Sequence, residues 1–560
     1  MATPDGSIAR RFAVLALLAS LGVTVAMMLR KNHIPGTAAG PARRIVGITV
    51  ISFLALMLTP TKWTHHFGVF AGLAGSVGAL AAVAVTAHVM TSRRNRTTFG
   101  AMVLFVLALS FASVNGWWYV SNFGVPWANE FPAWHFGFTT ILLGFSLLTL
   151  LLAAYFNFSA RGDRPWRPTR LGRLLHSPLA IAAWAMVLFE VFSLTLAMVN
   201  QYPAWSVGRS NLDALRGQTC GLATDVMVEQ DPNESMLAPV QGPAGAALGA
   251  TTAIGFTPNG IPTDMSPDAV AGQPGIGLQT DTDANEVTGS EPSTSGGTTA
   301  NLGVNGSRAQ LPYRLDPQRV PVLGSWSSGA QQPSTLRSSW YRLGARDADH
   351  PLLVVSAAGR FGPGEVVVEW AGDDGNPAGR LGFADVGAAP AWRNLRAPMA
   401  AIPASATQIR LVAKDNDLAP QHWIAVTPPR VPSLETLQEV VGSNDPVMLD
   451  WLVGLAFPCQ RPFGHQNGVV EVPKWRILPD RFGAEANSPV MDYLGGGPLG
   501  ITELLFRADP VPTYLNHDWF RDWGSLQRLV QFYPDAQPAR LDLGTAVRSG
   551  WWSPAPLRRS

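Results

Sequence analysis

Six long apolar runs fill the first two hundred residues, and this pattern constrains the fold more than any other feature of the chain. The runs cover roughly 12–29, 45–60, 69–90, 101–120, 135–157 and 179–199. Most approach the roughly 20 apolar residues that a helix needs to cross the hydrocarbon core of a bilayer. The runs stop after residue 200. The sequence therefore predicts six transmembrane helices over 1–200 and a non-membrane fold over 201–560.

The distribution of lysine and arginine predicts the orientation of these helices. The loops at 30–44, 91–100 and 158–178 are rich in them, whereas 61–68 has one and 121–134 has none. Because positively charged loops stay in the cytoplasm, the two poor loops and everything after residue 200 are expected outside a multi-pass plasma-membrane protein. Six spans with an outside C-terminus also place the N-terminus outside. The chain is therefore expected to be the second half of a longer membrane protein.

The outside loop at 58–68 carries a cluster of polar and aromatic groups at the membrane edge. Lys62, Trp63, His65 and His66 fall within five residues. A single histidine there is more often an interfacial hydrogen-bonding group, but ionisable groups clustered at a membrane are costly and tend to be functional. A cation beside imidazoles suits an anionic ligand such as a phosphate, and the indole suits a sugar face or a lipid boundary.

The second half of the chain is predicted to be β-rich. Residues 201–226 are expected to begin the exported domain, and 227–310, rich in Gly, Thr and Pro, to form a flexible insertion. From 311 to 560 short apolar runs recur between turn residues, which is typical of a β-sandwich or jelly roll. The clearest runs are 352–356, 365–370, 408–413 and 422–426; 432–441 suggests a short helix, and 516–529 a helix or irregular segment.

The composition of the whole chain narrows its possible functions. A formal net charge of +2 over 560 residues gives no support to nucleic-acid binding. Nineteen tryptophans are many; in a polar region they usually indicate core packing, but in an exported β-rich domain they also suggest sugar stacking.

The two cysteines and one acidic turn are the remaining candidate features. Cys220 and Cys459 both fall in the exported half, where one disulfide is the simplest account. Residues 414–417 read Lys-Asp-Asn-Asp after a strand. An Asx turn is the default interpretation, and a calcium corner, which Asn211 and Asp213 would join, is the alternative.

Three stretches resemble a known family. Residues 58–68, 110–119 and 450–462 are similar to the Emb-type cell-wall arabinosyltransferases, the ethambutol targets of mycobacteria, and the ending at 520–557 looks most like the A paralogue. The resemblance implies the C-terminal part of a GT-C membrane fold followed by an extracytoplasmic carbohydrate-binding module. It implies transfer of arabinofuranose from decaprenyl-phosphoryl arabinose onto cell-wall arabinan or galactan.

The resemblance also implies roles for individual residues. His65, with Trp63 beside it, would line the donor and drug site. Trp340 and Trp451 would stack sugars, and Cys220 would pair with Cys459. Asn211 and Asp415 would bind a structural calcium ion; no organic cofactor is expected.

One departure from the family puts catalysis by this chain in doubt. The family's catalytic acidic pair lies in its first large outside loop, and no Asp-Asp or Asp-Glu pair stands in an outside membrane loop here. The general base for the acceptor hydroxyl is therefore missing, and the chain alone is expected to be inactive. The alternative is a non-catalytic, membrane-anchored glycan-binding or scaffolding subunit. Either form would pair as a homodimer or with a paralogue. A transporter is disfavoured because the spans are expected to lack intramembrane charges.

Overall fold

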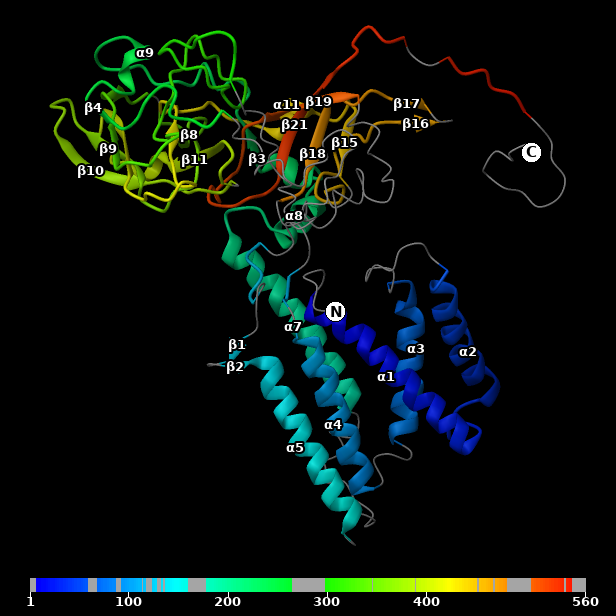
Figure 1. Ribbon diagram of the computed structural model, residues 1–560. Helices are drawn as coiled ribbons and strands as arrows, with labels where there is room; N and C mark the ends of the chain where they lie inside the picture. Colours follow the sequence, from blue (N-terminus) through cyan, green and yellow to red (C-terminus); the bar gives the residue numbers. More distant parts are fainter. Residues whose placement is uncertain are drawn as a thin grey trace.

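The computed structural model contains a bundle of helices below a β-rich region (Figure 1). It describes residues 7–58, 68–86, 92–112, 114–116, 123–127, 132–133, 136–159, 178–263, 298–344, 346–387, 389–450, 453–466, 469–480, 505–537 and 540–545.

Six long helices form the bundle in the described part of the chain. They are α1 (Ile8–Lys31), α2 (Ala39–Leu56), α3 (Ala71–Ala84), α4 (Arg93–Ser110), α5 (Phe138–Phe158) and α7 (Pro178–Gln201). Four of them, α1, α2, α5 and α7, are long and apolar enough to cross a membrane. Many of their large apolar side chains, such as Leu148 and Leu188, are exposed, which is expected of a surface that faces lipid.

One predicted span is displaced along the sequence. The fourth helix covers Arg93–Ser110 rather than 101–120. The side chain of Ser92 accepts a hydrogen bond from the backbone N–H of Asn95 and caps the helix, so its first turn includes arginines that were expected in a loop. The span at 179–199 also contains a charged residue, Glu190, in α7. The expectation of spans without intramembrane charges is therefore wrong at that position.

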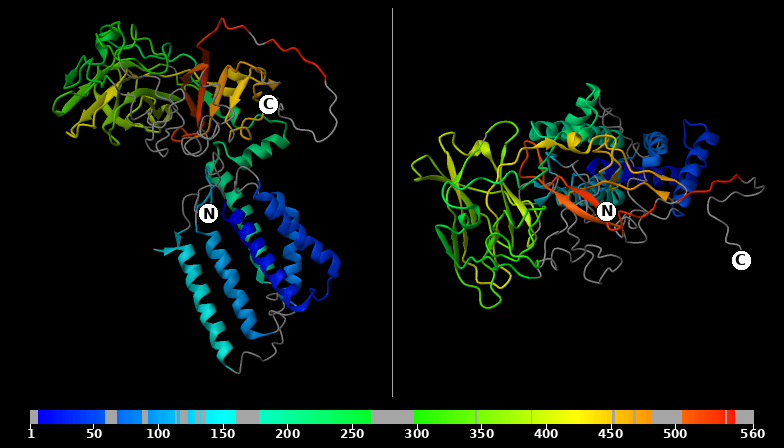
Figure 2. Two further views of the ribbon diagram at one scale, coloured as in Figure 1. Left: turned by 45° about the vertical axis from the view of Figure 1, so that its right-hand side comes forward. Right: turned by 90° about the horizontal axis from the view of Figure 1, so that it is seen from above.

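A β-sandwich forms the part of the β-rich region farthest from the helices (Figures 1 and 2). One sheet has the order β10-β9-β12-β6-β4 with β7 also paired to β12, and the other has the order β11-β8-β13-β5. Leu336 and Leu411 of the first sheet pack against Val355 and Leu395 of the second. The strands are β4 (Thr252–Ile254), β5 (Leu323–Gly324), β6 (Ser334–Arg337), β7 (Tyr341–Arg342), β8 (Leu352–Ala358), β9 (Val366–Ala371), β10 (Pro377–Gly382), β11 (Arg393–Pro398), β12 (Gln408–Asp415) and β13 (Ala425–Val426).

A second β-rich body lies between the sandwich and the helices. It has a three-stranded sheet, β14-β3-β20, and a four-stranded sheet, β15-β18-β21-β19, in which β15 and β18 are parallel. Its strands are β3 (Val226–Val228), β14 (Glu435–Thr436), β15 (Val447–Leu449), β18 (Trp475–Leu478), β19 (Phe506–Val511), β20 (Thr513–Leu515) and β21 (Ser525–Gln531). The short helices α8 (Val207–Leu215), η3 (Gly221–Thr224) and α11 (Leu437–Val441) pack with it.

Two predictions for this half are wrong. The predicted insertion at 227–310 contributes β4, the short helix α9 (Ala244–Ala247) and the buried side chains of Leu248 and Phe256 to the sandwich. Composition alone predicted that so many small residues could not form a core, but here they pack closely. Residues 264–297 lie outside the described part. The prediction for 516–529 is wrong only at its end: residues 516–524 are irregular, whereas 525–529 belong to β21, a strand because β18 and β19 pair with both its edges.

Two segments beside the membrane helices enter the hydrophobic core of the second β-rich body. Phe123, from the segment between α4 and α5, packs with Trp205 and with Phe457 and Trp523 of the second β-rich body. The side-chain amide of Gln201, at the end of α7, donates a 2.6 Å hydrogen bond to Asp518. The β-rich region is therefore joined to the bundle by packed side chains as well as by the chain itself.

Candidate functional site

The predicted donor site lies outside the described residues. Lys62, Trp63, His65 and His66 fall in the undescribed segment 59–67, between the end of α2 and the start of α3. Trp451 likewise lies outside the described residues, although its neighbour Asp450 is described. The roles expected of these five residues remain predictions.

Trp340 lies on the sandwich with one face of its indole against a guanidinium. The side chain is partly buried and directly precedes β7. The Cζ atom of Arg410 lies 4.5 Å from the centre of the indole ring, within the range of a cation–π interaction. A Glu369 carboxylate oxygen lies 2.6 Å from Nη2 of Arg410. The guanidinium is therefore fixed between the carboxylate and the ring, an arrangement that suits a stacking platform.

The described contacts do not assemble the predicted calcium site. Asn211 is on α8, which packs against α7 and η3, whereas Asp415 ends β12 in the sandwich. The buried carboxylate of Asp415 accepts a 2.6 Å hydrogen bond from Ser325 and lies 2.9 Å from Nδ1 of His422. Within the described ranges no group of three or more His, Cys, Asp or Glu side chains could bind a metal ion. Calcium binding by Asn211 and Asp415 therefore remains a prediction.

The turn at residues 414–417 has the default form expected from its sequence. The side chain of Asp417 accepts a hydrogen bond from the backbone N–H of Ala419, which is the pattern of an Asx turn.

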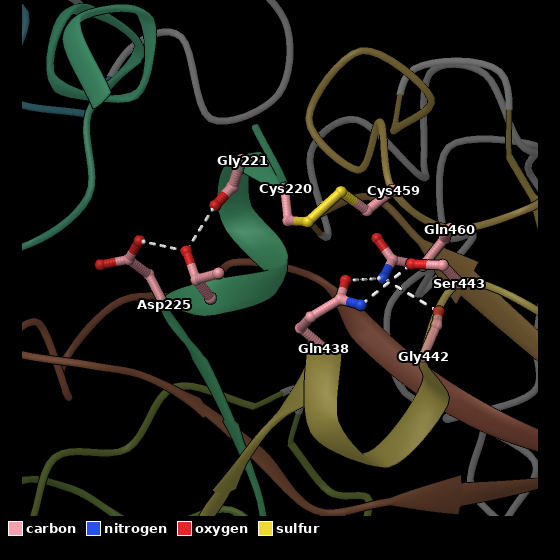
Figure 3. The surroundings of a disulfide bond; sticks show 9 residues. Cys220, Gly221, Asp225, Gln438, Gly442, Ser443, Cys459 and Gln460 are labelled. Atoms are coloured by element: carbon pink, nitrogen blue, oxygen red, sulfur yellow. Dashed lines mark hydrogen bonds between the residues drawn. A yellow bond between two sulfur atoms is a disulfide. The ribbon is translucent and has the colours of Figure 1, made fainter. Parts of the chain in front are cut away.

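Cys220 and Cys459 form the predicted disulfide (Figure 3). Cys220 directly precedes η3, and the bond ties it to a segment 239 residues later in the sequence. Gly221 makes this approach possible: its φ is +59° and an added Cβ would lie 2.5 Å from the carbonyl oxygen of Ala456. Nearby, the Gln460 amide donates a hydrogen bond to Gln438 of α11. The bridge therefore connects the segment that follows α7 to the second β-rich body.

A buried ion-pair network was not predicted from the sequence. Arg430 is fully buried, and its guanidinium donates to both carboxylate oxygens of Glu229, at 2.7 and 3.1 Å. It also donates to Ser356 and Asn394 of the sandwich, and the hydroxyl of Tyr514 donates to Glu229. Burial alone lowers the pKa of Arg430, but the Glu229 carboxylate and Tyr514 outweigh it and raise that pKa. The network joins the two β-rich bodies.

A second polar cluster lies inside the helix bundle. Arg11, near the start of α1, donates 2.9 and 2.5 Å hydrogen bonds to the carbonyl oxygens of Ser110 and Val114 after α4. The Asn115 amide donates a 3.1 Å hydrogen bond to Ser193 of α7. The two bonds from Arg11 satisfy carbonyl oxygens at the end of α4 and just beyond it, because the last carbonyl groups of a helix have no partner within the helix.

Comparison with known proteins identifies the family. The model of the EmbC C-terminal domain matches residues 191–558, and that of the mycobacterial cell wall arabinan synthesis protein matches residues 1–159. The chain is 72% identical to the probable arabinosyltransferase C of Mycolicibacterium smegmatis and 69% identical to that of Mycobacterium tuberculosis strain H37Rv. Each match covers 100% of this chain and 52% of the relative. The chain belongs to the Emb family of arabinosyltransferases.

A solved Emb-family structure has the same fold. The single-particle cryo-EM structure of arabinosyltransferase EmbB from Mycobacterium smegmatis matches 98% of this chain with a TM-score of 0.80 at 43% identity. The match covers 53% of that chain, so this chain spans about half the length of the Emb proteins it matches. The predicted family and the predicted GT-C membrane bundle followed by a β-rich half are confirmed.

The helices and the disulfide indicate the class of location. Within the described residues, four helices are long and apolar enough to span a membrane, and a disulfide is typical of an oxidising compartment. The chain is a membrane protein whose C-terminal β-rich half is extracytoplasmic.

The expected likeness to the A paralogue is corrected. Emb relatives with 66–72% identity are arabinosyltransferases C, and the B proteins are 45% identical. A short C-terminal stretch carries less weight than identity over 563 residues.

Proposed function

We propose that this chain takes part in the transfer of arabinofuranose from decaprenyl-phosphoryl arabinose to cell-wall arabinan or galactan. The observation that supports this most strongly is the 72% identity to a probable arabinosyltransferase C, which extends over the whole chain. A bundle with lipid-facing helices, whose connecting segments pack into an extracytoplasmic β-rich half, also suits a reaction between a lipid-linked donor and an external glycan.

The donor end of the proposed reaction lies at the loop between α2 and α3. The polyprenyl tail would stay in lipid, and the phosphate would lie beside Lys62, His65 and His66, with Trp63 against the sugar or the lipid boundary. An acceptor hydroxyl attacks the anomeric carbon, the bond from that carbon to the phosphate oxygen breaks, and polyprenyl phosphate leaves. Cationic groups at the leaving phosphate stabilise the negative charge that develops in the transition state. We assign the general base, which takes the hydroxyl proton, to none of these residues.

The acceptor end of the proposed reaction lies on the β-rich half. Trp340 is half-buried, and Arg410 supports one face of its indole. The other face would stack the apolar side of an arabinofuranose ring, and Trp451 would form a second platform. Two platforms would allow one glycan chain to be gripped at separated residues, which raises affinity without new chemistry.

The non-catalytic alternative makes a different prediction, and transfer in liposomes distinguishes the two. The assay uses radiolabelled decaprenyl-phosphoryl arabinose and a synthetic oligo-arabinofuranoside acceptor, with the purified chain alone and together with a full-length paralogue. If the proposed function is correct, transfer in the mixture should depend on His65 of this chain. Glycan binding by this chain without any effect of His65→Ala on transfer would instead support a scaffolding subunit, and no transfer by the chain alone would show that transfer requires the paralogue.

A further inference from the structure

The outer face of the larger sandwich sheet carries a row of polar side chains beside Trp340. Arg410 of β12 is the direct partner of Glu369 of β9, and Glu369 is the direct partner of Arg380 of β10. On the other side, Tyr341 pairs with Ile409, so Trp340 is opposite Arg410. Alternate residues of a strand point to opposite faces. Trp340, Arg410, Glu369 and Arg380 therefore lie side by side on the face opposite the buried Tyr341 and Ile409.

The strands of this face carry more cations than acidic residues. Arg410 and Arg380 have three more cations beside them. In β12, Gln408, Val412 and Lys414 point to the same face as Arg410. Arg342 is the partner of Gln408, and Arg337 is the partner of Val412. Glu369 is paired with Arg410. Glu365, just before β9 and opposite Lys414 in the register, has its carboxylate 3.2 Å from Nε2 of His422. Within the described part of the chain, Arg337, Arg342, Arg380 and Lys414 form no ion pair.

Two acidic residues lie at one edge of this face. Asp373 and Asp374 are exposed in the turn between β9 and β10. The Asp374 carboxylate accepts hydrogen bonds from the backbone and side chain of Asn376, and this bonding lowers its pKa. These carboxylates sit at the end of the strands and leave the cations along the strands unpaired.

The cations are also accessible. Arg342, Arg380 and Lys414 are exposed, and the strands β9 and β10 lie at the end of the molecule farthest from the second β-rich body (Figures 1 and 2). The Nε atom of Arg337 is buried without a hydrogen-bond partner. A buried donor of this kind normally has an acceptor, so this side of the face lacks one.

We propose that this face, here called the basic sheet face and defined by Arg337, Trp340, Arg342, Arg380, Arg410 and Lys414, binds a glycan that carries anionic substituents. This rests on the proposed function in one respect, which is that Trp340 stacks a sugar ring. The hydroxyls of a neutral glycan need hydrogen-bond partners but no excess of cations. Phosphate or carboxylate groups on a glycan do need cations, because guanidinium groups bind them through paired, charge-assisted hydrogen bonds. The indole selects the sugar, and the flanking cations select its charged substituents.

The test compares two ligands on the full chain in nanodiscs of neutral lipid. One is a neutral penta-arabinofuranoside, and the other is the same chain with one phosphate monoester; inorganic phosphate alone is a third arm. Titration calorimetry at 20 mM and 300 mM salt measures each affinity. The variants are Arg342→Gln and Arg380→Gln, singly and together. The matched control for each single variant is Arg540→Gln, which makes the same charge change at an exposed side chain outside the sheet.

The phosphorylated glycan is expected to bind more tightly than the neutral one at low salt, and the preference should shrink at high salt. Each removed arginine should weaken the phosphorylated glycan by about two- to fivefold and leave the neutral glycan unchanged, while Arg540→Gln changes neither. Inorganic phosphate should bind far more weakly than the phosphorylated glycan.

Three results would overturn the basic sheet face as an anionic-glycan site: equal affinity for the two glycans at low salt, an unchanged preference in the double variant, or equal affinity for the phosphorylated glycan and inorganic phosphate. A separate variant, Trp340→Ala, tests the part of the proposed function on which this inference rests. If Trp340→Ala binds the neutral glycan as well as the parent chain does, then stacking at Trp340 is wrong, whatever the two arginines do.

Discussion

Arg430 and Glu229 lie 201 residues apart in the sequence and form a fully buried ion pair, with Nε of the arginine 2.7 Å from a carboxylate oxygen. The pair belongs to the network that joins the sandwich to the second β-rich body. Because removal of one partner leaves the other charge buried without compensation, the β-rich half is expected to depend on it strongly.

Arg430→Met tests this dependence. We expect the free energy of unfolding of the β-rich half to fall by about 3–5 kcal/mol, measured by urea denaturation followed by near-UV circular dichroism. The matched control is Arg319→Met, which removes an exposed partner of Glu234 and should cost far less, because solvent screens an exposed pair. Equal losses in the two variants would show that the buried network contributes no more than a surface pair.

Reduction of the Cys220–Cys459 bond should destabilise the β-rich half by about 2–5 kcal/mol, because the bond closes a long loop in the unfolded chain. Thermal unfolding with and without reductant measures the effect. The variant with both cysteines changed to serine should be insensitive to reductant. Two free thiols in the native protein would exclude the bond.

His65→Ala should reduce arabinose transfer by about a hundredfold in an assay with the full-length family partner, since a group that stabilises the leaving phosphate acts mainly in the transition state. The control is His33→Ala, an exposed histidine between α1 and α2 whose ring nitrogen lies 3.0 Å from the carbonyl oxygen of Lys31. Unchanged turnover in His65→Ala would remove His65 from the donor site.

Trp451→Ala and Trp340→Ala should each weaken a neutral oligo-arabinofuranoside by roughly five- to thirtyfold, the range of a tryptophan that anchors an interface. The melting temperature should stay close to that of the parent chain. Trp184→Ala, at an exposed position of the membrane helix α7, serves as the control. Unaltered affinity with a lowered melting temperature would mean that the tryptophan is only a packing residue.

The pair between Arg461 and Glu471 should contribute stability that depends on pH. The Arg461 side chain and the backbone N–H of Gly464 lower the pKa of Glu471 from 4.5 to about 2. Because the folded-state pKa is depressed, the contribution is present above pH 4.5 and is lost as the pH falls toward 2. Between these values the melting temperature of the parent chain should fall more than that of Glu471→Gln. Parallel curves would contradict the assignment.

The sequence predicted the features that repeat locally. The apolar runs predicted all six described long helices, and alternating patterns predicted β8, β9 and β12 close to their observed ends. The start of α4 was missed because three arginines at 93, 94 and 96 suggested a loop, although a capped helix accommodates them in its first turn.

Contacts between distant residues could not be predicted in the same way. The segment 525–531 has apolar residues at Leu526, Leu529 and Val530, a spacing that also suits a helix; only the strands on both sides make it β21. No local pattern links Glu229 to Arg430 or aligns Trp340, Arg410 and Glu369 across three strands. These relationships arise when strands far apart in the sequence pair.

Phe123 brings a membrane-side segment into the core of the second β-rich body, and Arg521 covers its ring with a guanidinium 4.6 Å from the ring centre. A domain anchored in this way has a fixed position relative to the membrane helices and does not hinge on its linker. A ligand bound to the β-rich half would therefore stay at a constant distance from the ends of the membrane helices.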